Sequence, residues 1–234
     1  MKRLDDILRR TYPTLDDPVA AIRDGHVLVD GSVVTNPGSM VRRTASVALR
    51  KPAGLRGDTK LRAALEALRV TPRDLVALDA GSATGGFVKA LLDAGARRVY
   101  AVDVGHGQLL GSLRQDARVV NLEATNIAGL DTRLVPDRVD LVTLDLSYLS
   151  LTAAVPYLDR LSLSPDARLL ALVKPMFELR LPRPPDDEPR LAEALRRAEA
   201  GIEAAGWSVL GSIRSPHPGA RGAVEFFVHA RRAC

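Results

Sequence analysis

The chain has 234 residues, of which 46% are hydrophobic and 26% charged; this balance is typical of a folded globular protein and excludes an extensively disordered one. The net charge is +5, no apolar run approaches the roughly 20 residues needed to cross a bilayer, and the opening "MKRLDDILRR" is too charged for a secretory signal, so we expect a cytoplasmic protein. The single cysteine, Cys234, excludes internal disulfides, and with four scattered histidines we expect no metal site.

The first fifty residues predict a small α+β module. "RLDDILRR" has apolar residues at helical spacing, and "DDPVAAIRDG" predicts a second helix with an acidic cap, Pro18 in its first turn and Gly25 at its end. "VLVDGSVV" places Asp30 and Gly31 between two β-branched runs, which predicts a tight hairpin. We therefore expect a module at 1–50, followed by a linker at 51–57.

Basic residues gather at both ends of the chain. Residues 1–51 hold nine Lys and Arg against six acids, and residues 213–234 hold four against one, whereas the middle is nearly neutral. The excess favours a polyanionic partner, although ordinary solvated surface explains it almost as well.

Residues 58–234 alternate between short apolar runs and helical patterns, which predicts an α/β domain with a mostly parallel sheet. The last two strands are joined by a short, turn-rich connection and should pair antiparallel. The predicted strands are 75–80, 98–104, 117–123, 139–147, 167–175, 206–213 and 224–232, and the predicted helices are 60–69, 86–95, 151–161 and 189–205.

A glycine-rich turn, "LDAGSATGGF" at residues 78–87, follows the first strand of this domain. It approximates the GxGxxG pattern of dinucleotide sites, and it also has the DxGxxxGG pattern of a methyl-donor site. Asp79 favours the second interpretation, because a carboxylate at this position would repel a pyrophosphate. The residues predicted to contact the cofactor are Asp79, Gly81, Ser82, Thr84, Gly85, Gly86, Phe87, Asp103, Val104, Gln108, Asn126 and Asp145.

Four charged residues stand near the ends of separate elements. Lys60 precedes the first strand of the domain, Asp145 ends the fourth strand in "LDLS", Lys174 ends the fifth in "LVKPMFE", and Glu225 begins the last in "VEFF". In an open α/β sheet, ligands bind beyond the carboxyl ends of the strands, where these side chains can converge on one pocket.

These motifs, together with "RGDTKL", "YAVDVGHGQL" and "TNI", occur in the order found in the TlyA (haemolysin-like) group of FtsJ-type ribose methyltransferases. The N-terminal module resembles the S4 RNA-binding module that leads chains of this group. The resemblance implies a Rossmann-like methyltransferase fold, S-adenosylmethionine as cofactor, and 2′-O-methylation of ribosomal RNA. It maps the family's catalytic Lys-Asp-Lys-Glu tetrad onto Lys60, Asp145, Lys174 and Glu225.

The chemistry of methyl transfer fits this tetrad. A ribose 2′-hydroxyl is a poor nucleophile near neutral pH, so it needs positioning and removal of its proton. We expect Lys174 to hold the hydroxyl, either accepting its proton or stabilising the alkoxide as an ammonium. Asp145 and Glu225 would then orient Lys174 and Lys60.

The substrate is less certain than the reaction, because "LRLPRPPDDEPR" stands where the family has a glycine-rich stretch. A methyltransferase acting on a small hydroxylated metabolite is one alternative, and a catalytically idle RNA-binding protein is another. A membrane-active toxin and a nicotinamide oxidoreductase are weaker candidates. The arginines that we expect to contact the phosphates of ribosomal RNA are Arg9, Arg10, Arg23, Arg42 and Arg43.

Overall fold

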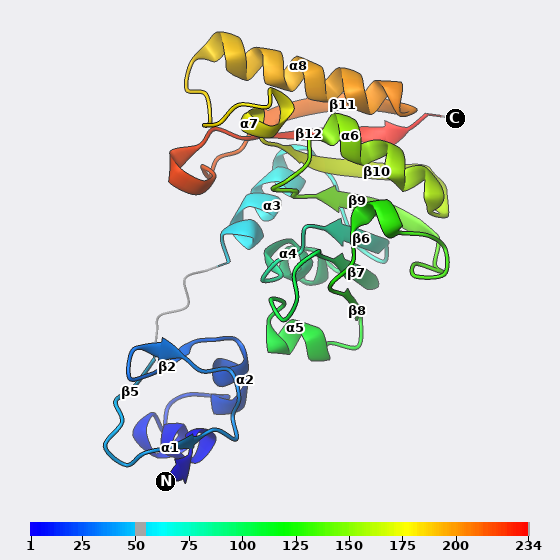
Figure 1. Ribbon diagram of the computed structural model, residues 1–234. Coiled ribbons are helices and arrows are strands. Elements are labelled where there is room, and N and C mark those ends of the chain that lie inside the picture. The colour runs from blue at the N-terminus through cyan, green and yellow to red at the C-terminus, as the bar shows by residue number, and fades with distance from the viewer. Residues whose placement is uncertain (50–54, 234) are drawn as a thin grey trace.

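The computed structural model describes residues 1–49 and 55–233, which form a small N-terminal module and a larger α/β domain (Figure 1). The predicted linker at 51–57 lies mostly outside the described residues. Its last two residues, 56 and 57, already belong to the first helix of the α/β domain, α3 (Arg56–Ala67). This helix starts before the predicted 60–69 because the run "RGDT" is compatible with a first helical turn and contains no proline.

The N-terminal module consists of two short helices, an antiparallel three-stranded sheet in the order β3-β2-β5, and an antiparallel pair, β1 and β4. As predicted, Asp17 caps the second helix by accepting hydrogen bonds from two backbone N–H groups, and Asp30 and Gly31 form the hairpin turn with positive φ angles. The elements are β1 (Lys2–Arg3), α1 (Leu4–Thr11), α2 (Pro18–Arg23), β2 (Val27–Val29), β3 (Ser32–Val33), β4 (Met40–Val41) and β5 (Val47–Leu49).

The α/β domain is built on a seven-stranded sheet in the order β11-β12-β10-β9-β6-β7-β8. The neighbours from β10 to β8 pair in parallel, whereas β12 pairs antiparallel with both β10 and β11. This confirms the predicted mostly parallel sheet with a reversed last strand. The strands are β6 (Val76–Ala80), β7 (Arg98–Val102), β8 (Val119–Leu122), β9 (Val139–Leu144), β10 (Leu163–Val173), β11 (Trp207–Arg214) and β12 (Phe226–Arg232).

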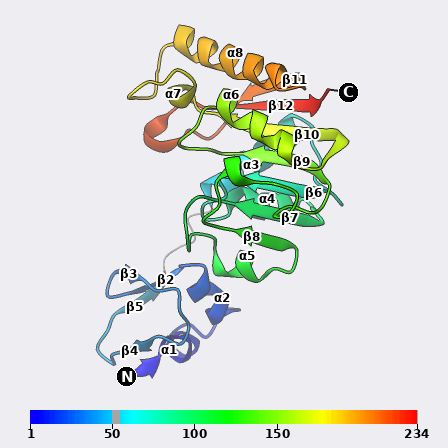
Figure 2. The same ribbon diagram turned by 45° about the vertical axis from the view of Figure 1, so that its right-hand side comes forward.

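Helices cover both faces of this sheet (Figure 2). One hydrophobic core packs α3 and α4 (Gly86–Asp93) against one face, and the other packs α6 (Leu151–Ala154) and α8 (Glu188–Ala204) against the opposite face. The predicted helix at 151–161 is α-helical only in its first turn and continues as a 3-10 helix. The remaining elements are short: α5 (Gly111–Gln115), η1 (Ile127–Gly129), η2 (Val155–Arg160), α7 (Pro175–Glu178) and η3 (Ala220–Gly222).

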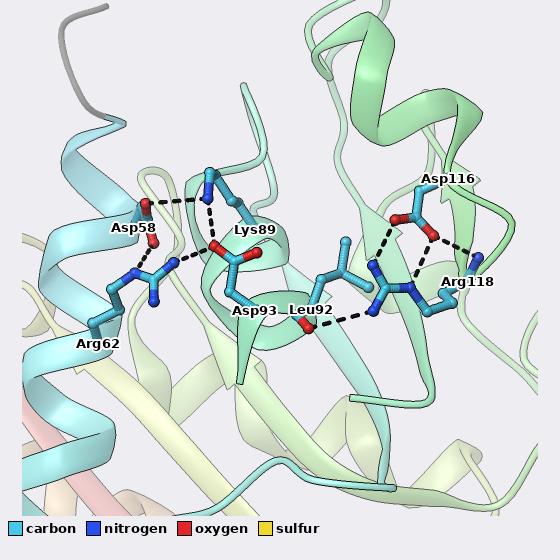
Figure 3. Close-up of polar contacts among 7 residues, drawn as sticks. All are labelled: Asp58, Arg62, Lys89, Leu92, Asp93, Asp116 and Arg118. Carbon is cyan, nitrogen blue, oxygen red and sulfur yellow. Dashed lines mark hydrogen bonds and ion pairs between the residues drawn. The ribbon is translucent and has the colours of Figure 1, made fainter. Parts of the chain in front are cut away.

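Helices α3 and α4 touch through their backbones. A Cβ atom added to Gly86 would lie 2.8 Å from the Cα of Gly57, and one added to Gly57 would lie 3.2 Å from the Cα of Gly86, so glycine at both positions favours this close approach. Ion pairs then join the two helices at the surface: Arg62 binds Asp58 at 2.5 Å on its own helix and also pairs with Asp93 of α4, which pairs in turn with Lys89 (Figure 3). The first turns of both helices are thereby fixed side by side.

The N-terminal module contacts the α/β domain through α2 and α5. Arg23 donates a hydrogen bond to the Gln115 side chain at 2.6 Å, and Asp24 accepts one from the backbone N–H of Ser112 at 3.2 Å. Gly111 permits the contact, since a Cβ there would lie 2.7 Å from the Cβ of Arg23. Within residues 1–49 and 55–233, no helix is long and apolar enough to cross a membrane.

The contact between α3 and α4 gives a stability prediction. Gly86→Ala should lower the free energy of unfolding by about 1–3 kcal/mol, because the new Cβ meets backbone atoms that cannot rotate away. Gly129→Ala is the matched control, since a Cβ there would meet nothing within 4 Å, and it should change stability by less than about 0.5 kcal/mol. Urea unfolding without cofactor measures both values. Equal stability of the two variants would contradict the contact.

Candidate active site

The candidate site lies at the carboxyl ends of the parallel strands, where the loops after β6, β7, β9 and β10 gather. The strand register aligns these ends along one edge of the sheet: Ala80 at the end of β6 pairs with Val102 of β7 and with Leu144 of β9. Residues that follow these strands are therefore neighbours in space although they are far apart in the sequence.

The glycine turn connects β6 to α4. Gly81 has a φ of 88° and a Cβ there would lie 2.2 Å from the carbonyl oxygen of Asp145, while a Cβ on Gly85, at a φ of 95°, would collide with Leu113. Glycine is therefore required at both positions. The turn is held against β7, because the N–H groups of Gly81 and Ser82 both donate to the Val102 carbonyl. It leaves the N-terminus of α4 at the edge of the site.

Two predicted residues of this turn have different surroundings. Ser82 is buried, and its hydroxyl has no hydrogen-bond partner within the described residues. The ring of Phe87 lies in the core, stacked on Phe227 with 6.0 Å between the ring centroids. Any contact of Phe87 with a ligand would therefore have to use its backbone, and the side chain serves packing.

Asp79 is a buried carboxyl group with an unused oxygen. One oxygen accepts a hydrogen bond from the Thr143 hydroxyl at 2.7 Å, and the other has no partner in the described part of the chain. Burial raises the pKa of Asp79 to about 8, and the hydrogen bond from Thr143 only partly offsets this. A buried acceptor without a donor is costly in free energy, so this carboxyl group fits a cationic or hydrogen-bonding ligand.

The loop after β7 is fixed by two carboxylates. Asp103 accepts hydrogen bonds from the N–H groups of Ala83 and Gly105, which ties the loop to the glycine turn. Glu123, which the sequence analysis did not select, accepts from the N–H groups of Gln108 and Leu109. Burial opposes ionisation of Glu123, but these hydrogen bonds and one from Asn121 outweigh it and lower its pKa to about 2.

A narrow crevice runs between the glycine turn and this loop. Its volume is about 10 Å³, and Gly81, Asp103, Val104, Leu146 and Tyr148 are among the residues that line it. Tyr148 and Leu146 were missed individually, although both lie in the quoted motif "LDLSYLSL".

Outside the glycine turn, the side chains of two predicted cofactor-binding residues, Asn126 and Gln108, contact other parts of the protein. The Asn126 side chain caps η1 by accepting from the N–H of Ala128, and its neighbours Thr125 and Ile127 line the crevice. The amide of Gln108 lies against Gly105, where a Cβ would come within 1.8 Å of it.

The four tetrad residues form two ion pairs. Lys60 of α3 binds Glu225 with 2.6 Å between Nζ and Oε2, and both side chains are more than 90% buried. Lys174 lies 2.6 Å from Oδ1 of Asp145 and donates a hydrogen bond to the Ser147 hydroxyl at 2.7 Å. The Lys174–Asp145 contact does not have the geometry of a hydrogen bond, so it acts through charge.

Strand register brings the two pairs together. Val173 of β10 is paired with Phe226 of β12 in an antiparallel ladder, so the next residues outward, Lys174 and Glu225, face each other across these strands. Lys60, Lys174 and Glu225 line one cavity of about 480 Å³, whose outer wall is formed by the proline-rich loop around Arg183. Three of the four tetrad residues thus line one cavity, and the fourth, Asp145, contacts Lys174 beside it.

This arrangement can hold a substrate hydroxyl group and take part in the removal of its proton. The Lys174 ammonium lies at the cavity wall and is less buried than Lys60, with 17% of its side chain exposed against 9%. A substrate hydroxyl entering the cavity therefore meets Lys174 more easily, whereas Lys60 is enclosed with Glu225.

The arginines predicted to contact RNA all lie on the N-terminal module. Arg42 and Arg43 line a shallow cavity of about 350 Å³ together with Lys2. Arg9 pairs with Asp6 at 3.5 Å and Arg10 is exposed on the same helix. As described above, Arg23 lies at the contact between the two parts of the molecule.

Comparison with known proteins identifies both parts of the chain. The model of the FtsJ-like methyltransferase family matches residues 55–232, and that of the S4 domain matches residues 19–47. The chain is 40% identical to the 16S/23S rRNA (cytidine-2′-O)-methyltransferase TlyA of Mycobacterium tuberculosis, over 88% of this chain and 80% of the relative. It is 32% identical to the 23S rRNA (cytidine-2′-O)-methyltransferase TlyA of Campylobacter jejuni, over 74% of this chain and 69% of the relative.

The fold is also similar to solved structures. One of them, described as "Putative hemolysin from Streptococcus thermophilus", has a TM-score of 0.73 and 28% sequence identity and covers 99% of this chain and 88% of its own. The matched family models together with the 40% identity over most of the chain place it without ambiguity. The chain belongs to the FtsJ-like methyltransferase family, as the sequence motifs predicted, and carries an S4 domain before its catalytic domain.

Proposed function

We propose that this protein transfers a methyl group from S-adenosylmethionine to a ribose 2′-hydroxyl of ribosomal RNA. The observation that carries the proposal is the pairing of Lys60 with Glu225 and of Lys174 with Asp145 around one cavity. The backbone of Asp145 also lies against Gly81, so the cavity adjoins the glycine turn. A hydroxyl held at Lys174 would thus stand next to the place where a methyl donor is expected.

The residues of the glycine turn fit S-adenosylmethionine. The unused oxygen of Asp79 and the unpaired hydroxyl of Ser82 offer polar partners to its amino-acid part, and Gly81 leaves room for a close approach. Asp103 and the crevice beside it would hold the adenosine part, and its narrowness implies that Val104 and Tyr148 move apart on binding. When bound, the cofactor supplies an electrophilic methyl group on a sulfonium.

The tetrad would act on the substrate hydroxyl. We assign Lys174 to hold the 2′-oxygen and, after releasing a proton of its own to solvent, to accept the hydroxyl proton while the oxygen–methyl bond forms and the methyl–sulfur bond of the donor breaks. Asp145 and Ser147 fix the Lys174 ammonium at 2.6 and 2.7 Å. Lys60 and Glu225 form the opposite wall of the same cavity and position the ribose.

Ribosomal RNA is supported as the substrate by the relatives and by the S4 domain. The relative from Mycobacterium tuberculosis is named for 16S and 23S rRNA and the one from Campylobacter jejuni for 23S rRNA alone. The target subunit of this protein is therefore an experimental question. Because ribosomes work in the cytoplasm, we propose that the protein acts there too.

Lys174→Ala should lower the rate of methyl transfer by about two to four orders of magnitude, because it removes the group that holds the substrate hydroxyl and accepts its proton. The measurement uses S-adenosylmethionine with a labelled methyl group and, separately, small subunits, large subunits, intact ribosomes and a small-molecule extract. Arg196→Ala is the control, an exposed basic residue on α8 outside the cavity, and it should keep near-parental activity.

Two results would contradict this proposal. Near-full turnover by a folded Lys174→Ala variant would remove Lys174 from the reaction. Label that enters only the small-molecule extract would instead favour a metabolite methyltransferase, and the proline-rich loop at the cavity wall would then be the place to study.

Asp79 should make cofactor affinity depend on pH. Because the pKa of Asp79 is about 8 without ligand, the carboxyl group is mostly protonated at neutral pH. A cationic amino group binds the ionised form, so binding releases a proton and affinity should rise by up to about tenfold per pH unit below pH 8. Titration calorimetry with S-adenosylhomocysteine measures this slope. Asp79→Asn should flatten it, and an unchanged slope in that variant would exclude Asp79 as its source.

A further inference from the structure

A second cavity adjoins the catalytic cavity. It has a volume of about 390 Å³ and is lined by Arg56 and Thr59 of α3 and by the loop that contains His217 and Arg221. Arg221 lines both cavities, so the two adjoin at this side chain. We call the second cavity the Arg221 groove.

The charge of the Arg221 groove is uncompensated. Arg56, His217 and Arg221 are exposed, and no carboxylate among residues 1–49 and 55–233 forms an ion pair with either arginine. The Glu225 carboxylate, which lies against Gly219 of this loop, is buried and already paired with Lys60. Two guanidinium groups that face one hollow repel each other and favour an anion between them, and planar guanidinium groups match the oxygens of a phosphate.

The groove is held rigidly to the catalytic residues. Arg56 and Lys60 are four residues apart on α3 and lie on the same face of the helix, one turn from each other. On the other side, Gly219 packs against the Glu225 carboxylate, where a Cβ would lie only 2.1 Å from Oε1, and its N–H closes the loop by donating to the Ala223 carbonyl. An anion in the groove would therefore stand at a fixed offset from the tetrad.

We propose that the Arg221 groove binds a phosphodiester of the RNA strand next to the ribose that enters the catalytic cavity. This inference rests on the proposed function, since it assigns the groove to the same substrate. S-adenosylmethionine contains no phosphate, so a phosphate bound here belongs to the acceptor substrate. The groove thus favours a polynucleotide over an uncharged hydroxylated metabolite, and it fixes the strand so that one 2′-hydroxyl reaches Lys174.

The test compares Arg221→Gln and the double variant Arg56→Gln/Arg221→Gln with the parent. Arg133→Gln is the matched control: this arginine is exposed and precedes β9, so it lies at the opposite edge of the sheet. Initial rates of methyl transfer to bacterial ribosomal subunits that lack the modification give kcat and KM at several salt concentrations. Calorimetry gives the affinity for S-adenosylhomocysteine, and thermal unfolding checks that each variant is folded.

Loss of Arg221 should raise the KM for the subunit on the order of tenfold, with kcat and cofactor affinity within about twofold of the parent. The slope of log KM against log salt should fall by about one for the single variant and about two for the double variant. Arg133→Gln should match the parent. The inference is wrong if both groove variants keep the KM and the salt slope of the control.

Failure of the proposed function is a separate result, in which the parent methylates no RNA. In that case, fluorescence anisotropy with a labelled single-stranded RNA of about 20 nucleotides still decides the inference, because it needs no turnover. Weaker, less salt-dependent binding by the groove variants than by Arg133→Gln would support the phosphate site. Equal binding by all four proteins would overturn it.

Discussion

Helices α3 and α4 approach so closely that the backbone of Gly57 lies against that of Gly86, and much of the site depends on this contact. The first turn of α4 carries the end of the glycine turn, and Lys60 follows Gly57 by three residues on α3. A side chain at Gly86 would push the two helices apart and with them the glycine turn and Lys60. Each glycine costs about 1 kcal/mol of helix propensity relative to alanine. The ion pairs between Arg62, Asp93 and Lys89 help to offset that cost.

Most of the fold follows from local sequence patterns. The strands of the large sheet are short apolar runs separated by helical patterns, and the hairpin at Asp30 and Gly31 needs two positive φ angles that these residues accept. Helix α5 escaped prediction because five residues are too few to show a helical period. The 3-10 geometry of η2 likewise depends on packing, and Pro156 in its first turn lacks the N–H that a continuing α-helix would use.

The residues of the site could be predicted from the sequence, but only some of the contacts between them could. A charged residue at a strand end is visible in a sequence, and so the four tetrad residues could be chosen. Their pairing could not, because Lys60 and Glu225 are 165 residues apart and meet only after the sheet is assembled. Glu123 was missed for a related reason: its function is to accept hydrogen bonds from backbone N–H groups, which leave no pattern in side-chain identity. Asn126 and Phe87 show the converse, since conspicuous residues in a motif also cap helices and fill cores.

The buried charges of the site fall into two kinds. Each lysine of the tetrad has a carboxylate at 2.6 Å, so the tetrad keeps its own charges compensated without any ligand. Asp79 has no cation beside it, and burial therefore favours its neutral form until a ligand brings a positive charge. The charge of Asp79, beside the glycine turn, thus depends on the ligand that binds there, whereas the two ion pairs of the tetrad are already formed without a ligand.

The reversed direction of strand β12 explains how the charged residues of the tetrad come together before a ligand binds. In a parallel sheet every strand ends at the catalytic edge, so residues that precede a strand lie at the opposite edge, far from the chemistry. Because β12 runs antiparallel to β10, its beginning lies at the catalytic edge, and Glu225 just before it stands opposite Lys174 just after β10. The loop that leads into β12 arrives at the same edge and brings Gly219 and Arg221 with it. One antiparallel strand thereby supplies both a wall of the catalytic cavity and the cationic groove beside it.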